Sequence, residues 1–307
     1  MEKTVLVTGA NGMLATNIIE KLALAGYKVI GTVRKGRSYR GEGRENVTVV
    51  EADFKDETAM KPLVSECDVV FHVAAMTSQS ETDYEKFRKV NVESTRMLLD
   101  LSVASGVGTF VYVSTANTIG YGAAEGAEMK YPFSKSLYAL SKKEAETVAL
   151  SYQDKLRVVV VNPTFMIGKY GTEKGSNRIF SMVRKSKIVF CPSGGKNVLD
   201  VEEAARGMIL AMEKAVSGSQ YLITGTNYHY RELFGRMAES FGVKRIFVKL
   251  PDWILKTAGC FGDLMAKCGI VTEVSTLNMD MLMTENFYHT DKAFREIGFK
   301  ARDIFDR

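Results

Sequence analysis

Short apolar runs alternate with amphipathic segments through the first half of the chain. The runs are rich in valine and apolar at consecutive positions, which is typical of parallel strands buried on both faces. The alternation predicts strands at residues 5–8, 28–33, 47–51, 69–73, 109–114 and 158–161. Helical spacing is clearest over 90–104 and 134–152. This order predicts an α/β fold of the Rossmann type, a doubly wound parallel sheet with helices between its strands.

The pattern changes after Asn162-Pro163, where loop-rich stretches begin. A helix is predicted over 201–214 and a strand over 220–224, which we expect to return to the sheet. Residues 251–268 carry apolar side chains at helical spacing and predict a core or lid helix rather than a membrane anchor. The expected division is a dinucleotide-binding domain at 1–162, rejoined by 198–225, and a smaller, discontinuous C-terminal substrate lobe at 163–197 and 226–307.

A glycine-bearing turn follows the first predicted strand directly and runs into a helical pattern. Gly9 permits a tight turn, Gly12 lets the backbone approach a phosphate, and the helix start offers free amides to an anion. Ala15 stands where a third glycine is usual. An ordinary strand-to-helix turn in some other α/β protein is the less favoured interpretation. As a dinucleotide site, it predicts cofactor contacts at Gly9, Asn11, Gly12, Met13 and Leu14.

The end of the second predicted strand carries Arg34 and Lys35 and no carboxylate. A carboxylate there would bind the ribose 2′-hydroxyl, whereas a guanidinium suits a 2′-phosphate through charge-assisted hydrogen bonds. The sequence therefore favours NADP(H), with NAD(H) as the alternative. A solvated basic loop that binds no ligand is the other interpretation.

Further cofactor contacts are predicted after the third and fourth strands. Asp53 could accept a hydrogen bond from the adenine amino group and Phe54 could flank the ring, or the two could be a helix-capping and packing pair. The small residues Val73, Ala74 and Ala75 would let a dinucleotide lie against the backbone. His72 precedes them inside an apolar run, so we expect a core histidine rather than a catalyst.

Tyr138 and Lys142 are four residues apart and so share one helix face. A neighbouring ammonium favours the phenolate and would lower the phenol pKa towards neutral pH, where the tyrosine could act as an acid or base. Lys142 could also bind the nicotinamide ribose. At the end of the fifth strand, Thr115, with Ser114 as the alternative, could hold a substrate oxygen, unless both hydroxyls merely bond to the turn backbone.

Composition excludes some classes of function but does not identify one. The net charge of +5 suits an anionic small ligand, and no basic stripe indicates nucleic acid. No uncharged apolar stretch reaches the length of about 18 residues that a membrane span requires. The four cysteines are scattered without metal-ligand spacing. We expect a cytoplasmic protein with reduced thiols and no metal site.

Several of these motifs occur together and in order. The turn at 8–15, the segment 73–75, Ser114-Thr115 and the Tyr138-Lys142 pair resemble the extended short-chain dehydrogenase/reductase superfamily, also called the NAD(P)-dependent epimerase/dehydratase family. Residues 162–168 and 194–198 are similar to its dihydroflavonol-4-reductase-like branch, which borders the 3β-hydroxysteroid dehydrogenases.

The resemblance implies roles for matching positions. Tyr138 would be the general acid for ketone reduction or the base for alcohol oxidation, with Lys142 lowering its pKa and Thr115 orienting the substrate oxygen. Further residues implied to lie near the nicotinamide are Pro163, Thr164 and Phe165. The resemblance also implies a homodimer through a four-helix interface that uses the helices carrying Asn91 and Tyr138.

The implied function is an NADP(H)-dependent oxidoreductase that interconverts a ketone or aldehyde and an alcohol on a small organic substrate. An NAD-dependent nucleotide-sugar epimerase is the alternative within the superfamily. A non-catalytic NADP-sensing regulator is a third hypothesis, disfavoured because the chain keeps the Tyr138-Lys142 pair. Ser114–Ala116 also lacks the acid pair that sugar-nucleotide dehydratases carry there.

Overall fold

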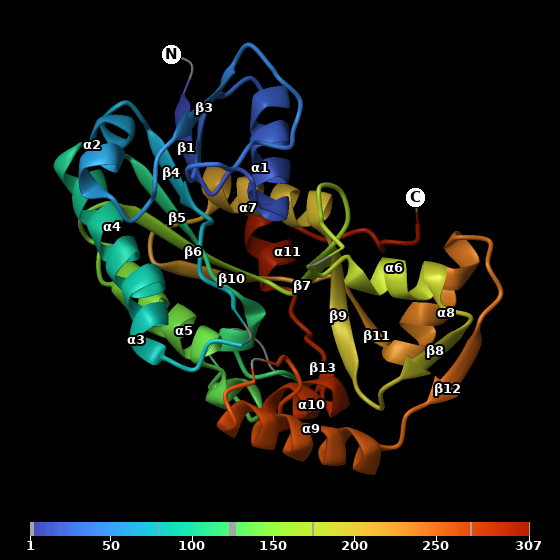
Figure 1. Ribbon diagram of the computed structural model, residues 1–307. Coiled ribbons are helices and arrows are strands. Elements are labelled where there is room, and N and C mark those ends of the chain that lie inside the picture. The colour runs from blue at the N-terminus through green and yellow to red at the C-terminus, as the bar shows by residue number, and fades with distance from the viewer. Residues whose placement is uncertain (1–2, 79, 123–126, 174, 271, 307) are drawn as a thin grey trace.

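The computed structural model describes residues 3–78, 80–122, 127–173, 175–270 and 272–306. Its main sheet has seven strands in the order β10-β6-β5-β4-β1-β2-β3, all paired in parallel (Figure 1). The strands are β1 (Thr4–Thr8), β2 (Lys28–Val33), β3 (Val47–Glu51), β4 (Val69–His72), β5 (Thr109–Val113), β6 (Arg157–Pro163) and β10 (Ser219–Ile223). The expected Rossmann-type sheet is confirmed.

Helices cover both faces of this sheet (Figure 1). One face carries α1 (Met13–Leu24), α7 (Val201–Lys214) and the short α11 (Lys292–Ile297). The other carries α2 (Glu57–Ser65), α3 (Tyr84–Phe87), α4 (Ser94–Ala104) and α5 (Leu137–Leu150). Between α3 and α4, residues Arg88–Glu93 form a π-helical turn, so the helix predicted over 90–104 is not regular throughout.

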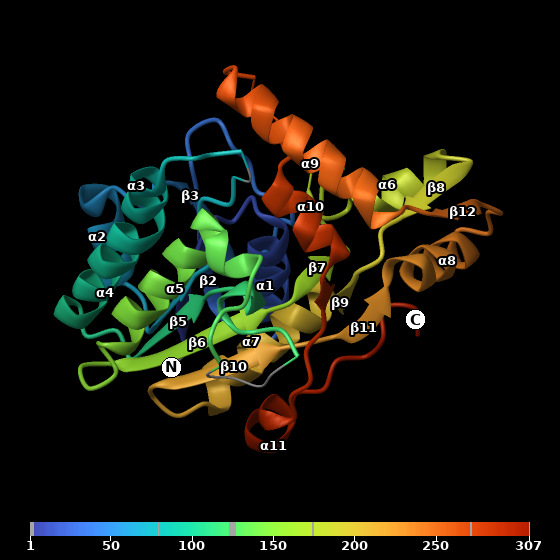
Figure 2. The ribbon, with the colours of Figure 1, turned by 90° about the horizontal axis from the view of Figure 1, so that it is seen from below.

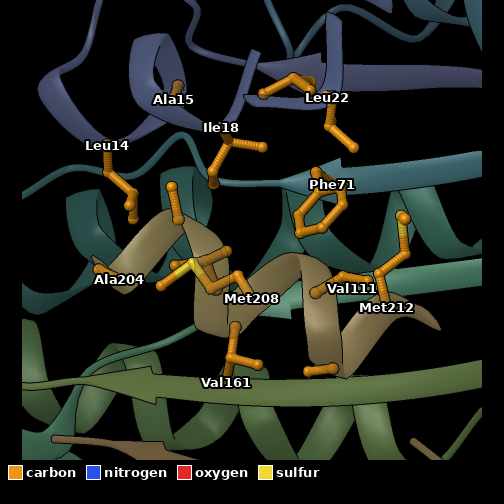
Figure 3. Close-up of a cluster of buried hydrophobic side chains, with 14 of the residues drawn as sticks. Leu14, Ala15, Ile18, Leu22, Phe71, Val111, Val161, Ala204, Met208 and Met212 are labelled. Atoms are coloured by element: carbon orange, nitrogen blue, oxygen red, sulfur yellow. The ribbon is translucent and has the colours of Figure 1, made fainter. Parts of the chain in front are cut away.

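The alternation of strand side chains fills two separate cores. Val5 and Val7 point towards α1 and α7, whereas Leu6 packs on the α2–α5 side. Figure 3 shows the first core, where Ile18 of α1 and Met208 of α7 meet above the strand residue Val161. Runs that are apolar at consecutive positions are therefore required, because both faces of the sheet are covered.

The smaller lobe is built around β9 (Gly195–Asp200). Its sheet adds β7 (Phe165–Ile167), β11 (Thr226–His229) and β13 (Glu285–Asn286), and β8 (Ile188–Cys191) pairs separately with β12 (Ile246–Lys249). Its helices are α6 (Arg178–Lys185), α8 (Tyr230–Ser240), α9 (Asp252–Lys267) and α10 (Thr276–Met283).

The chain passes between the two regions more than once. β9 pairs within the smaller sheet, but its Leu199 already packs into the core of α1 and α7, and α7 follows from Val201. The C-terminal part also returns, because Ala293 and Ile297 pack into the core of α1 and α7. A helical pattern in the sequence does not reveal which core the helix will join.

The predicted amphipathic helix is α9, and it lies at the edge of the molecule (Figure 2). It buries only Leu255, Gly259 and Gly262 and packs against α10. Within the described ranges, no helix has the length and apolar character needed to traverse a bilayer.

Candidate active site

A cavity of about 850 Å³ lies at the carboxyl ends of the main-sheet strands. Gly9, Arg34 and Val73 each follow directly on the last residue of a strand and line it. Gly9 adopts a left-handed φ of 75°, and a Cβ there would stand 3.1 Å from the Ala74 Cβ. Both constraints require glycine at this position. A Cβ on Gly12 would meet only the Gly9 carbonyl oxygen, so Gly12 keeps the approach to the cavity open.

Thr8 fixes the two central strand ends relative to each other. Its hydroxyl accepts hydrogen bonds from the amides of Val73 and Ala74, both at 3.0 Å. The His72 ring nitrogen Nδ1 lies 3.0 Å from the same oxygen. His72 is fully buried, and burial lowers its pKa to about 3, so this histidine stays neutral in the core as the sequence predicts.

The first turn of α1 also lines the cavity, through Met13, Leu14 and Ala15. Its N-cap, Gly12, has no side chain that could occupy the leading amide groups. The start of the helix therefore presents amides and the positive end of its dipole to the cavity, which is the arrangement that binds phosphate.

The cavity is strongly cationic. Arg34, Arg40, Lys55 and Lys142 line it, and no Asp or Glu does so among the described residues. Sequence reasoning missed Arg40, which donates a hydrogen bond to the carbonyl oxygen of Tyr170 at 3.2 Å. The signal available was the run of basic residues after the second strand, but the sequence did not say how that loop folds back.

The structure brings most predicted cofactor residues to this cavity. Those that line it are Gly9, Asn11, Gly12, Met13, Leu14, Arg34, Phe54, Val73, Ala74, Ala75, Tyr138, Lys142 and Pro163. Four predicted contacts lie outside the lining. Lys35 is exposed, and Asp53 forms an ion pair with Lys55 at 3.3 Å. The Thr164 amide bonds to the Ile223 carbonyl, and the Phe165 ring lies 5.0 Å from the Lys196 ammonium.

Tyr138 stands near the start of α5, whose first turn is capped by the Ser136 hydroxyl. Burial raises the pKa of Tyr138 to about 12, a hydrogen bond with Thr115 partly opposes this, and the Glu146 charge adds to the rise. The tyrosine is therefore a phenol at neutral pH. The influences on its pKa here are burial, Thr115 and Glu146, and the lowering by Lys142 stays a prediction.

Lys142 is buried below the cavity. Its ammonium donates a hydrogen bond to the Val113 carbonyl at 2.7 Å and lies 4.1 Å from the centre of the Tyr112 ring. Burial lowers its pKa to about 7, and the Glu146 charge opposes the shift. Near neutral pH, Lys142 is therefore divided between its charged and neutral forms.

Glu146 is a residue that sequence reasoning missed. Its Oε1 accepts hydrogen bonds from Ser114 at 2.6 Å, Thr118 at 2.5 Å and the Asn162 amide at 2.6 Å. The signal was its place one turn beyond Lys142 on the same helix face. Ser114 lines the cavity and donates its hydroxyl to Glu146, whereas Thr115 lies outside the lining. The Thr115 hydroxyl accepts from the Asn117 amide at 3.3 Å, as the turn-backbone alternative expects, and also forms a hydrogen bond with Tyr138.

Asn91, like Glu146, supports the site through hydrogen bonds to neighbouring elements. Its Oδ1 accepts from the Met76 amide at 2.7 Å, and its Nδ2 donates to the Ser141 hydroxyl at 2.9 Å. It thus fastens a loop of the cofactor cavity to α5.

A second cavity of about 460 Å³ opens on the other side of Tyr138, between the start of α5 and the α9–α10 pair. Phe87, Leu137 and Leu277 give it an apolar component. Lys135 is the cation among its described lining residues, which include no arginine. Tyr138 lines both cavities and so stands where two ligands would meet.

Comparison with known proteins gives this geometry a family context. The model of the NAD dependent epimerase/dehydratase family matches residues 5–224. A 4-hydroxy-2-methyl-3-oxo-4-farnesyl-3,4-dihydroquinoline-1-oxide ketoreductase from Stigmatella aurantiaca is 25% identical over 96% of this chain and 91% of its own. A dTDP-glucose 4,6-dehydratase from Streptomyces antibioticus is 30% identical over 78% of this chain and 77% of its own.

Solved structures agree on the architecture. A double mutant of the Streptomyces venezuelae dTDP-glucose 4,6-dehydratase, solved with NAD bound, superposes with a TM-score of 0.75. The alignment covers 98% of this chain and 93% of that one at 20% identity, which supports the fold alone.

Proposed function

Because this chain belongs to the NAD dependent epimerase/dehydratase family, we propose that it is an NADP(H)-dependent oxidoreductase that interconverts a ketone or aldehyde and an alcohol. Its relatives are NAD(P)-dependent reductases, dehydrogenases and epimerases, so a nicotinamide-dependent enzyme is the starting point. The observation that carries the proposal is Tyr138, a half-buried phenol shared by a cationic dinucleotide-sized cavity and a second cavity.

The residues of the first cavity fit a dinucleotide that carries a 2′-phosphate. The start of α1 suits a pyrophosphate, and Gly9 and Gly12 leave room for it. Arg34 and Arg40 supply guanidinium charge that suits a further phosphate, and Lys55 lines the same cavity while paired with Asp53, whose carboxylate lies outside the lining. When bound, NADP(H) supplies or accepts the hydride.

The chain itself handles the proton and the substrate oxygen. In reduction, the Tyr138 hydroxyl donates its proton to the developing alkoxide, and a pKa of about 12 keeps that proton in place until it is needed. Thr115 holds the same substrate oxygen. Glu146 of α5 accepts hydrogen bonds from Ser114, Thr118 and Asn162 at the ends of β5 and β6. These bonds hold the turn that carries Thr115 in a fixed position relative to α5.

The second cavity favours this reaction over nucleotide-sugar epimerisation. A sugar nucleotide brings a diphosphate, which proteins commonly bind through arginine forks. Among the described residues of that cavity Lys135 is the cation, and Arg178 forms an exposed ion pair with Glu273 instead. Ala116 and Asn117 also follow Thr115 where a sugar dehydratase would carry two acids.

The cofactor test is a titration of the protein with NADPH and NADH, read by calorimetry. NADPH should bind at least tenfold more tightly than NADH. Arg34→Ala and Arg40→Ala should each lower the ratio of the two affinities by about tenfold, because each variant loses one charge-assisted hydrogen bond to the 2′-phosphate. Arg37→Ala is the matched control, because Arg37 is exposed and lies outside the lining. Tighter binding of NADH by the unaltered chain would contradict the 2′-phosphate assignment.

The homodimer through the helices that carry Asn91 and Tyr138 stays a prediction. Light scattering of the full chain across a concentration series would test it.

A further inference from the structure

The outward face of α9 is apolar. Trp253, Phe261 and Leu264 lie on one side of the helix and are 67%, 63% and 57% exposed. The opposite side, with Gly259 and Gly262, packs against α10. A surface helix of a globular protein normally turns its large apolar residues inward and its small or polar residues outward. On α9, Leu255 follows this rule, but Trp253, Phe261 and Leu264 face outward and two glycines face inward.

The β8–β12 pair extends this apolar surface. Ile188, Phe190 and Ile246 are exposed, whereas the alternate residues Val189 and Cys191 are buried against the lobe core. β12 leads into α9 through Leu250-Pro251, and the Ser193 hydroxyl donates to Asp252 at 2.6 Å, which joins the end of β8 to the start of α9. Figure 2 shows α9, β8 and β12 along one edge of the molecule, with α10 and α8 on their inner side.

Lysines surround this edge. The exposed ones are Lys187, Lys244, Lys249, Lys256 and Lys267. In the part of the chain that the structure describes, none of them forms an ion pair. The two carboxylates of α9 are engaged, since Asp252 accepts from Ser193 and Asp263 accepts from the Thr276 amide at 3.2 Å.

We propose that α9 and the β8–β12 pair form a surface that lies on an anionic lipid bilayer without crossing it. Exposed Trp and Phe are the side chains that settle at the headgroup boundary, and lysines beside them reach the anionic phosphates. A second copy of the chain is the less suitable occupant. In a two-fold pair each lysine rim would face a similar rim and repel it. This inference is independent of the proposed reaction.

Trp253 provides a direct probe, because it is the chain's single tryptophan. The unaltered protein is mixed with vesicles of phosphatidylcholine alone or of equal parts phosphatidylcholine and phosphatidylglycerol. We expect the Trp253 emission to shift to shorter wavelength and the protein to float with the anionic vesicles. The Lys256→Gln/Lys267→Gln double variant should bind about 25-fold more weakly, at about fivefold per lysine.

Apolar variants separate insertion from simple charge attraction. Phe261→Ser/Leu264→Ser should lower vesicle affinity by at least tenfold, because apolar burial contributes with the area inserted. Leu24→Ser/Val216→Ser is the matched control, since Leu24 and Val216 are 68% and 70% exposed elsewhere on the molecule. This control should float as the unaltered protein does. Circular dichroism and urea unfolding check that every variant is folded.

Two results would overturn the proposal. One is the absence of both flotation and an emission shift with anionic vesicles. The other is an emission shift without lipid that grows with protein concentration and accompanies a dimer in light scattering, which would assign the surface to a second copy.

Discussion

Tyr138 lies between the two cavities, and the residues that enclose them, here called the cofactor wall and the substrate wall, are held in place differently. The cofactor wall consists of strand ends and the start of α1, held by fully buried residues such as Thr8 and Val7. The substrate wall rests on α9, which buries little, and on α10, in which no described residue is buried. The cofactor geometry is therefore part of the main core, whereas the substrate wall can change without disturbing that core.

The largest effect should come from the residue that both walls share. Tyr138→Phe removes the proton donor and keeps the ring, so turnover should fall by about 10³-fold, within the range for loss of a general acid. NADPH affinity should stay within about twofold, because the cationic residues of the cofactor wall are unchanged. The measurement is steady-state reduction of a carbonyl panel together with NADPH calorimetry. Full turnover in this variant would remove Tyr138 from the mechanism.

The next largest effect separates the two hydroxyls at the end of β5. Thr115→Ala should lower kcat by about 10²-fold, because Thr115 bonds to Tyr138 and would hold the substrate oxygen. Ser114→Ala should leave kcat near normal and lower the free energy of unfolding by about 2 kcal/mol, because Glu146 loses a buried donor. Urea unfolding and turnover measured on both variants check this. The reverse pattern would make Ser114 the substrate hydroxyl.

The contrast between the walls also explains what the sequence could predict. The cofactor motifs are local, since the turn around Gly9 and the segment after β4 place their own backbone at strand ends. Lys142 and Glu146 depend on contacts with β5 and β6, which only the folded chain brings together. Asp53 and Phe165, which lie outside the cavity lining, have partners in Lys55 and Lys196 that the sequence did not indicate.

The smaller lobe was less predictable for the same reason. Its short strands β8 and β12 come from distant segments, and their pairing depends on the core beneath them. Residues 251–268 were expected to form a core or lid helix. The sequence indicated the helix and its apolar side chains, but could not show that Trp253 and Phe261 face outward.

A smaller effect should be confined to the substrate wall. A Cβ at Gly262 would overlap the Val274 carbonyl, so Gly262→Ala should push α9 away from its neighbour and raise the substrate KM by about tenfold. NADPH affinity should not change. Gly235→Ala is the matched control in α8, where a Cβ meets nothing within 4 Å, and it should stabilise the lobe by about 0.5–1 kcal/mol. A matching loss of NADPH affinity in Gly262→Ala would show that the walls are coupled.

The last effect concerns the pH dependence of stability rather than activity, and it arises from the charge buried in the cofactor wall. Lys135 of the substrate wall is exposed and offers no parallel. Burial lowers the Lys142 pKa from 10.5 to about 7 in the folded protein. Between these values the unfolded chain binds the extra proton, so stability should rise with pH by at most about 1.4 kcal/mol per unit above pH 7 and stay level below it. Lys142→Met should lose this rise. Subtracting its urea-unfolding free energies from those of the unaltered protein, between pH 6 and 9, removes the contribution of His72 and other groups. A difference that does not vary with pH would mean that Lys142 keeps an ordinary pKa and that its burial beside Val113 is relieved by water.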